Sequence, residues 1–142
     1  GIATPLIAHW PAGIAEPGQW RRSPGHVIDL TPTVLEAAGH PTPNTFASAE
    51  APPTPGISLT PTFAGASAAD RPPLWWLHEG NRAVRYGDWK LVAVRGEPWE
   101  LFNLGEDRTE TNNLAASAPE KAAELKAIWQ ANAKQFADDL GH

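Results

Sequence analysis

The stretch RAVRYGDWKLVAVRGEPWELFNL, residues 82–104, decides the fold class of this sequence. Apolar and polar side chains alternate along most of it, which is typical of strands with one buried face. The alternating segments are Arg82–Tyr86, Asp88–Val94 and Trp99–Leu104. Tyr86-Gly87-Asp88 and Gly96-Glu97-Pro98 supply the turns between them. Because short connections join antiparallel neighbours, the sequence predicts a small antiparallel sheet of three or four strands.

A long amphipathic helix is predicted after this sheet. Ser117-Ala118-Pro119-Glu120 has the pattern of a capping box, with the proline inside the first turn. The helix is expected to run to about Leu140, and Gly141 would end it. Its apolar face would be formed by Leu125, Ile128, Trp129, Asn132 and Phe136. One helix packed on one sheet face completes a small α+β layer.

The amino-terminal forty residues have a different pattern. Ile2–Trp10 is a short apolar run and predicts a buried strand, although Pro5 weakens its pairing on one side. Residues 26–39, HVIDLTPTVLEAAG, predict a helix with Asp29 at its N-cap and Gly39 at its end.

A proline-rich segment, residues 41–73, connects these two regions. Eight of the fifteen prolines of the chain lie between His40 and Pro73, among Ala, Ser and Thr. Such a composition predicts extended surface chain, with at most a short ordered stretch at Gly56–Phe63. The sequence is therefore divided into residues 1–40, 41–73 and 74–142.

Composition excludes several classes of function. The net charge of −5 gives no reason to expect a nucleic acid or an anionic membrane as partner. No apolar run approaches the roughly 20 residues that span a bilayer, so we expect a soluble protein of the cytoplasm or the periplasm. The absence of cysteine removes disulfides and thiolate chemistry. The chain opens on Gly1 without methionine or a signal-peptide pattern, which suggests a fragment.

The stretch LWWLHEGNRAVRYGDWKLV, residues 74–92, holds the best candidates for a binding site. A histidine and an arginine close together can bind an oxyanion through charge-assisted hydrogen bonds. If residues 74–77 form a strand, Trp75 and Trp76 point to opposite faces, so at most one could face a ligand. In the alternative interpretation the tryptophans pack on the helix, and the charges are solvated or paired. The candidate residues are His78, Glu79, Asn81 and Arg82.

Other polar clusters favour structural roles. Residues 107–113, DRTETNN, offer oxygen ligands but lack the glycine and final glutamate of an EF-hand calcium loop. Asx turns explain them better. His9 and His26 have no local metal partners, and no serine lies in a G-x-S-x-G setting. The sequence thus offers no evident nucleophile and no metal site.

The order of four segments resembles the carboxy-terminal portion of bacterial arylsulfatases, members of the sulfatase family in the alkaline-phosphatase-like superfamily. The resemblance covers nearly the whole chain except the proline-rich stretch. The pattern at Asp29–Thr33, DLTPT, also recurs in phosphonate monoester hydrolases. The segments are GIATPLIAHWPAGI, HVIDLTPTVLEAAG, EGNRAVRYGDWKLV and WELFNLGEDRTETNNLA.

In that family a Cys or Ser in a C/S-x-P-x-R motif becomes formylglycine, and Asp and Asn oxygens hold calcium. None of these motifs is in this chain, so the resemblance assigns it no catalytic or metal-binding residue. Calcium and formylglycine are expected in the full-length parent. Gly1 and Pro5 resemble the end of an E-G-G-x-x-x-P pattern that follows a catalytic lysine. Residues 1–40 would then be a strand and helix of the large α/β domain, and residues 74–142 the small subdomain.

The resemblance implies the carboxy-terminal part of a sulfuric ester hydrolase that helps to wall the substrate cleft and is inactive alone. Its expected partners are the amino-terminal catalytic part of the parent and a sulfate-ester substrate. For residues 1 to about 40 three outcomes stay open: disorder, self-association by pairing of the exposed front strand with that of another copy, or packing on the small subdomain. Two alternatives stay open, a phosphonate or phosphate ester hydrolase of the same superfamily and a free-standing tryptophan-rich module that binds sugar or protein.

Overall fold

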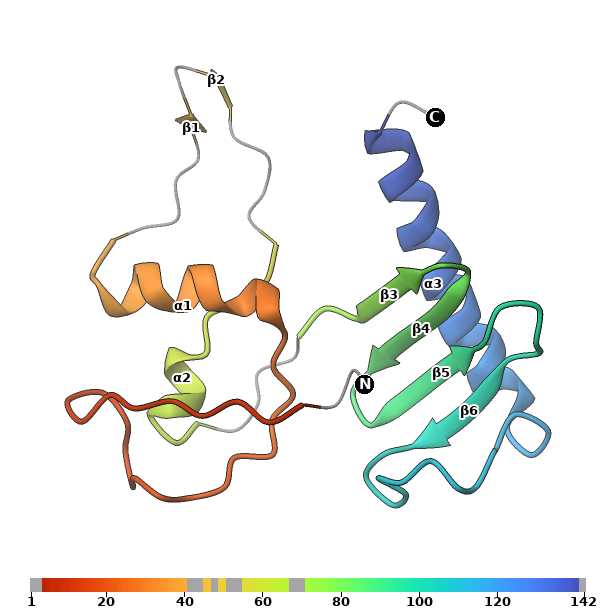
Figure 1. Cartoon of the computed structure of the whole chain (residues 1–142), viewed down its shortest axis with the longest axis horizontal. Helices are drawn as coiled ribbons and strands as arrows, with labels where there is room; N and C mark the ends of the chain where they lie inside the picture. The colour runs from red at the N-terminus through yellow and green to blue at the C-terminus, as the bar shows by residue number, and fades with distance from the viewer. Residues whose placement is uncertain (1–3, 41–44, 47–48, 51–54, 67–70, 141–142) are drawn as a thin grey trace. The chain divides into compact units, whose positions relative to one another are not determined.

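The chain forms two compact units, Gly1–Ala69 and Asp70–His142. The computed structural model describes residues 4–40, 45–46, 49–50, 55–66 and 71–140 (Figure 1). The break between the units falls inside the predicted connecting segment 41–73. The assignment of residues 1–40 to a larger domain stays a prediction.

The carboxy-terminal unit contains a four-stranded antiparallel sheet in the order β3-β4-β5-β6. Each strand pairs with the next strand along the chain, as the short turns predict. The strands are β3 (Leu74–His78), β4 (Asn81–Tyr86), β5 (Trp89–Ala93) and β6 (Glu100–Asn103). The predicted meander is confirmed.

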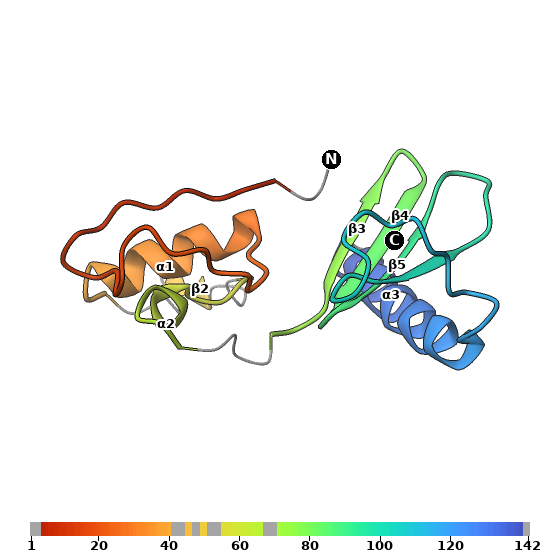
Figure 2. The ribbon, with the colours of Figure 1, turned by 90° about the horizontal axis from the view of Figure 1, so that it is seen from below.

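Helix α3 (Pro119–Asp139) packs on one face of this sheet (Figure 2). The core between them consists of side chains that are completely buried, one from each of β4, β5, β6 and α3. They are Val84, Leu91, Leu101 and Leu125. Around this core Trp129 meets the rings of Trp75 and Trp99 edge-on, at centroid distances of 6.5 and 5.7 Å. The predicted α+β class is therefore confirmed.

The start of α3 differs from the prediction. Ala118 is its N-cap and makes no side-chain cap, while the Ser117 hydroxyl donates to the Leu114 carbonyl at 3.2 Å. With Pro119 as the first helical residue, Ser117 lies one position too early to cap, and Lys121 takes the third position. The predicted capping box is thus wrong, because a box needs its serine immediately before the helix.

The amino-terminal unit is built from short elements. A single 3₁₀ turn, η1 (Val27–Asp29), leads into helix α1 (Leu30–Ala37). A second short helix, α2 (Thr60–Phe63), lies within the stretch predicted to be ordered. Two strands of two residues each, β1 (Thr45–Phe46) and β2 (Ala49–Glu50), pair in antiparallel fashion.

Polar side chains on one side of α1 hold this unit together. Asp29 occupies the predicted N-cap position but does not cap, and its carboxylate accepts the His26 amide at 2.7 Å and the Ile57 amide at 3.0 Å. Four residues on, the Thr33 hydroxyl accepts the Leu59 amide at 2.8 Å. Both side chains are buried, and they fasten residues 57–59 to α1.

The predicted strand Ile2–Trp10 is not formed in the described residues. Gly1–Ala3 lie outside them, and Thr4–Trp10 has no strand pairing. The side chains of Leu6 and Ile7 are 57% and 92% exposed. A strand requires a neighbour to accept its backbone hydrogen bonds, and no described part of the chain supplies one.

Candidate functional site

The candidate residues lie at the end of the β3–β4 hairpin. His78 pairs with Asn81, and the two residues between them form the turn. Glu79 and Gly80 both have positive φ, 51° and 84°, which is the pattern of a type I′ turn. A side chain at Gly80 would press on Arg95, because an added Cβ would lie 2.9 Å from the Arg95 Cγ.

The strand alternation divides the candidates between the two sheet faces. Trp75 pairs with Val84 on the face that packs on α3, and Leu77 pairs with Arg82 on that same face. His78 and Asn81 therefore belong to the opposite face. The prediction that Trp75 and Trp76 separate agrees with this alternation, since Trp75 is the one that packs on the core.

Arg82 is already engaged within the fold. Its guanidinium lies over the Trp99 ring, 4.6 Å from the centroid. One of its terminal nitrogens donates to the Glu97 carbonyl at 3.4 Å. Cation–π contact with a tryptophan that also packs on α3 gives Arg82 a structural part in this unit.

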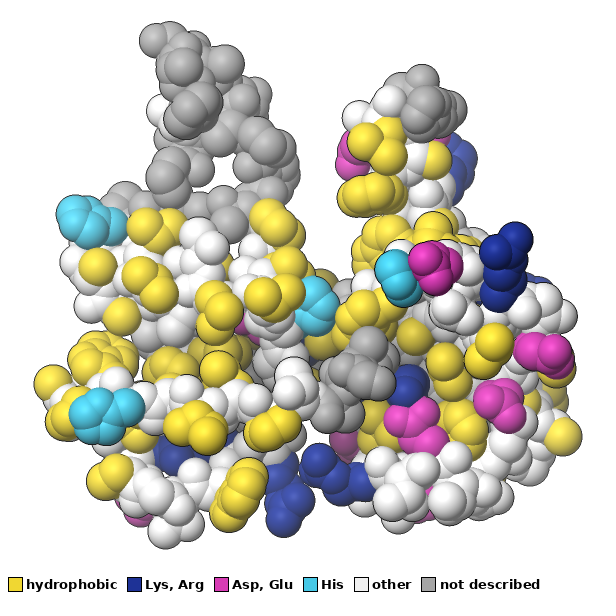
Figure 3. All heavy atoms as spheres, in the orientation of Figure 1, with side chains coloured by type: hydrophobic (Ala, Val, Ile, Leu, Met, Phe, Trp, Pro, Cys, Tyr) yellow, Lys and Arg dark blue, Asp and Glu magenta, His cyan; other side chains and the backbone are white. Residues whose placement is uncertain are grey.

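Asn81 contacts a residue that the sequence analysis did not select. The Asn81 side-chain oxygen accepts the Arg95 amide at 3.1 Å. Arg95 follows β5, and an antiparallel meander brings the end of β5 back beside the β3–β4 turn. The register of the predicted meander was the signal that could have identified Arg95 as a neighbour of this turn. Over this turn Figure 3 shows a histidine, an acidic and a basic side chain next to one another.

These groups suit binding better than catalysis. His78, Glu79, Asn81 and Arg95 are all exposed. An imidazole, a guanidinium and a carboxamide can donate hydrogen bonds to a sulfate or sugar oxygen. Within this exposed group no side chain is paired with a base that could activate it as a nucleophile.

Asp107 uses its carboxylate inside its own turn. It accepts the amides of Thr111 and Asn112, both at 2.8 Å, and the Thr109 hydroxyl at 3.0 Å. The backbone hydrogen bond from Asn112 is the main reason why the pKa of Asp107 lies below its ordinary value. The interpretation as an Asx-type turn agrees with these bonds.

No group of three or more His, Cys, Asp or Glu side chains in the described ranges is placed to hold an ion. Nor is any helix in those ranges long and apolar enough to cross a membrane.

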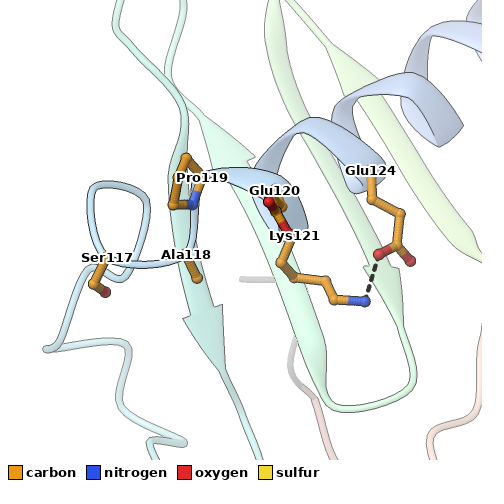
Figure 4. A pocket seen from close by; sticks show the side chains of 6 residues that line it. All are labelled: Ser117, Ala118, Pro119, Glu120, Lys121 and Glu124. Carbon is orange, nitrogen blue, oxygen red and sulfur yellow. Dashed lines mark hydrogen bonds and ion pairs between the residues drawn. The ribbon is translucent and has the colours of Figure 1, made fainter.

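A shallow hollow lies at the start of α3 (Figure 4). Its charged residues include Lys121, whose ammonium pairs with the Glu124 carboxylate at 2.5 Å. None of the predicted site residues lines it. We therefore retain the β3–β4 hairpin end as the candidate site.

Comparison with known proteins finds sulfatases that are similar in sequence to this chain. No protein-family model matches the chain. The sequence is 29% identical over 136 residues to the uncharacterized sulfatase PB10D8.02c of Schizosaccharomyces pombe, covering 91% of this chain and 24% of that protein. It is 30% identical over 116 residues to N-acetylgalactosamine-6-sulfatase of Mus musculus, covering 81% of this chain and 21% of the relative.

A solved structure agrees at the level of the fold. The crystal structure of Ps i-CgsB superposes with a TM-score of 0.67 at 24% identity, covering 85% of this chain and 28% of that one. The chain thus spans about a quarter of the length of the proteins it matches. The chain is a homologue of the sulfatases, in the alkaline-phosphatase-like superfamily, over the carboxy-terminal portion of those proteins.

Proposed function

We propose that this chain is the carboxy-terminal part of a sulfuric ester hydrolase, and that the β3–β4 hairpin end forms one wall of its substrate cleft. The observation that carries the proposal is the similarity to sulfatases along 81–91% of the chain. A preceding part of the same protein would supply the formylglycine nucleophile and the calcium ligands.

The hairpin end would recognise the substrate without reacting with it. The His78 imidazole and the Arg95 guanidinium would donate hydrogen bonds to the group that carries the sulfate ester. Asn81 holds Arg95 in place through the bond from its oxygen to the Arg95 amide. Such contacts lower KM by binding the ground state, and they affect kcat less.

The amino-terminal unit would attach this chain to the catalytic part. Several of its large apolar side chains face outward, and burying each would contribute roughly 1.5–3 kcal/mol. Among them Ile7 is 92% exposed and Val34 is 66% exposed. An apolar surface of this kind suits a permanent interface within one protein better than contact with water.

The experiment is complementation. The chain alone, with or without calcium, should not hydrolyse an activated aryl sulfate. Co-expressed with the preceding segment from its own gene, it should restore turnover. Turnover by the rigorously purified chain alone would overturn the proposal, as would an upstream segment that is fully active without the chain.

In the complemented enzyme, His78→Ala tests the cleft wall. We expect KM to rise about tenfold, the value of one hydrogen bond to a charged group, with kcat nearly unchanged. His40→Ala is the matched control, since His40 is an exposed histidine outside the hairpin. Equal kinetics in the two variants would remove His78 from the site while leaving the sulfatase proposal intact.

A further inference from the structure

Two cations lie directly opposite one another on the sheet face away from α3. Arg85 of β4 pairs with Lys90 of β5, and the alternation places both side chains on this face. Like charges at directly opposed positions destabilise a sheet unless something neutralises them. Figure 3 looks onto this face and shows basic and acidic side chains side by side over it.

Lys90 is neutralised within the fold. It is 8% exposed, and its ammonium donates to both carboxylate oxygens of Glu110 at 2.6 Å. The contact also fixes the loop that follows β6 over this face. Arg108 lies two residues before Glu110 in that loop and is exposed.

Arg85 is not neutralised to the same degree. Its Nε donates to the Gly87 carbonyl at 3.1 Å, which leaves the fork of its terminal nitrogens for other acceptors. Partial burial lowers its pKa, and Arg108 and Arg71 lower it further, against the opposing effect of Asp88. Among the described residues here, Arg85, Lys90 and Arg108 lie near two carboxylates, Asp88 and Glu110, in a chain whose net charge is −5.

We propose that Arg85 and Arg108 form a binding site for an oxyanion, a sulfate or phosphate group that is either free or carried on a polyanionic glycan. The planar fork of a guanidinium matches such oxygens in bidentate fashion. A half-buried arginine gains more from this contact than an exposed one, because less water competes for it.

This site is separate from the hairpin end. Arg85 lies four residues along β4 from Asn81, about 13 Å at the rise of a strand. Binding here therefore does not depend on the proposed function, and either can fail without the other.

The test is titration of the 142-residue chain at low ionic strength, followed by amide chemical shifts. Sodium sulfate, inorganic phosphate and a sulfated oligosaccharide are the three ligands. Saturable shifts at residues 85–90 and 108–110 are expected. If the oligosaccharide binds much more tightly than sulfate at an equal sulfate concentration, the ligand is the polyanion. Equal affinity assigns the site to the free anion.

Arg85→Gln and Arg108→Gln should each weaken binding about tenfold, the value of one hydrogen bond to a charged group. Arg22→Gln, an exposed arginine of the other unit, is the matched control and should change nothing. Arg108 lies in an exposed loop, so its variant answers the question even if Arg85→Gln unfolds the sheet. Unsaturable binding, or equal loss in the Arg22 and Arg108 variants, would overturn the proposal.

Discussion

The two units of this chain differ in the side chains that they bury most deeply. In the carboxy-terminal unit Leu91 and Leu125 are 0% exposed and form the centre of an apolar core. Among the described residues of the amino-terminal unit the most buried side chain is that of Asp29, also 0% exposed, while Trp20 is 86% exposed. The carboxy-terminal unit is held mainly by apolar packing. The described residues of the amino-terminal unit include one buried apolar side chain, Leu59 at 6% exposed, and hydrogen bonds hold much of the rest.

This difference predicts which unit can fold on its own. Apolar burial is the dominant favourable term in folding, whereas one hydrogen bond contributes only about 1 kcal/mol net. A sheet and a helix that cover each other should therefore fold alone. A helix whose Leu30 and Val34 face outward depends on a surface that covers them.

Amide hydrogen exchange on the monomeric chain tests this contrast between the two units over the most residues. We expect protection of about a thousandfold or more in β5, because a domain stability of at least about 5 kcal/mol resists global opening. The amides of Thr4–Trp10 should exchange nearly as fast as those of an unfolded chain, since no described residue pairs with them.

Sedimentation must establish the monomer first, because pairing between copies would also protect this segment. Strong protection of Thr4–Trp10 in a proven monomer would contradict the comparison. The front segment would then belong to a sheet within the chain.

Truncation of one apolar side chain in each unit tests the same contrast in free energy of unfolding. Leu125→Ala should destabilise the carboxy-terminal unit by about 2–5 kcal/mol, because it leaves a cavity beneath the sheet. Val34→Ala removes an apolar side chain that is 66% exposed and should stay within about 0.5 kcal/mol. Chemical denaturation followed by tryptophan fluorescence measures both. Similar losses in the two variants would show that the amino-terminal helix is covered in solution.

The same contrast explains what the sequence could predict. Strand alternation and helix spacing are local signals, so β4, β5, β6 and α3 could be found from residues 82–140 alone. Arg95 could not, because only the register of the finished sheet brings it to Asn81. The front strand was predicted from apolar content, which does not reveal whether a pairing partner is present. The separation of Arg82 from His78 follows from alternation and could have been predicted.

A substitution at Asp29 tests the hydrogen bonds that hold the amino-terminal unit together. Asp29→Ala removes the acceptor of the Ile57 amide, and hydrogen bonds to charged groups contribute about 1.5–3 kcal/mol. Exchange of the Ile57 amide should therefore accelerate roughly ten- to a hundredfold. Protection in β5 should not change. The control is Asp138→Ala, which removes an exposed carboxylate paired with Lys134. A parallel loss of protection in β5 would show that the units unfold together.

The smallest expected effect concerns Asp107, whose carboxylate holds a turn of the carboxy-terminal unit through hydrogen bonds. Because its pKa is lowered in the folded state, chiefly by the Asn112 amide, this carboxylate stabilises the turn above its unfolded pKa of about 3.9. That contribution is lost as the pH falls through the lower, folded value. We expect the Thr111 and Asn112 amide resonances to shift in that acid range while β5 stays protected. Asp107→Asn should abolish the shift.

Calcium should leave the Thr111 and Asn112 amide resonances unmoved at neutral pH, because the Asp107 carboxylate already accepts hydrogen bonds from both amides. Tight calcium binding would show that the turn can open to release its oxygens, and that it is less firmly held than the apolar core beside it.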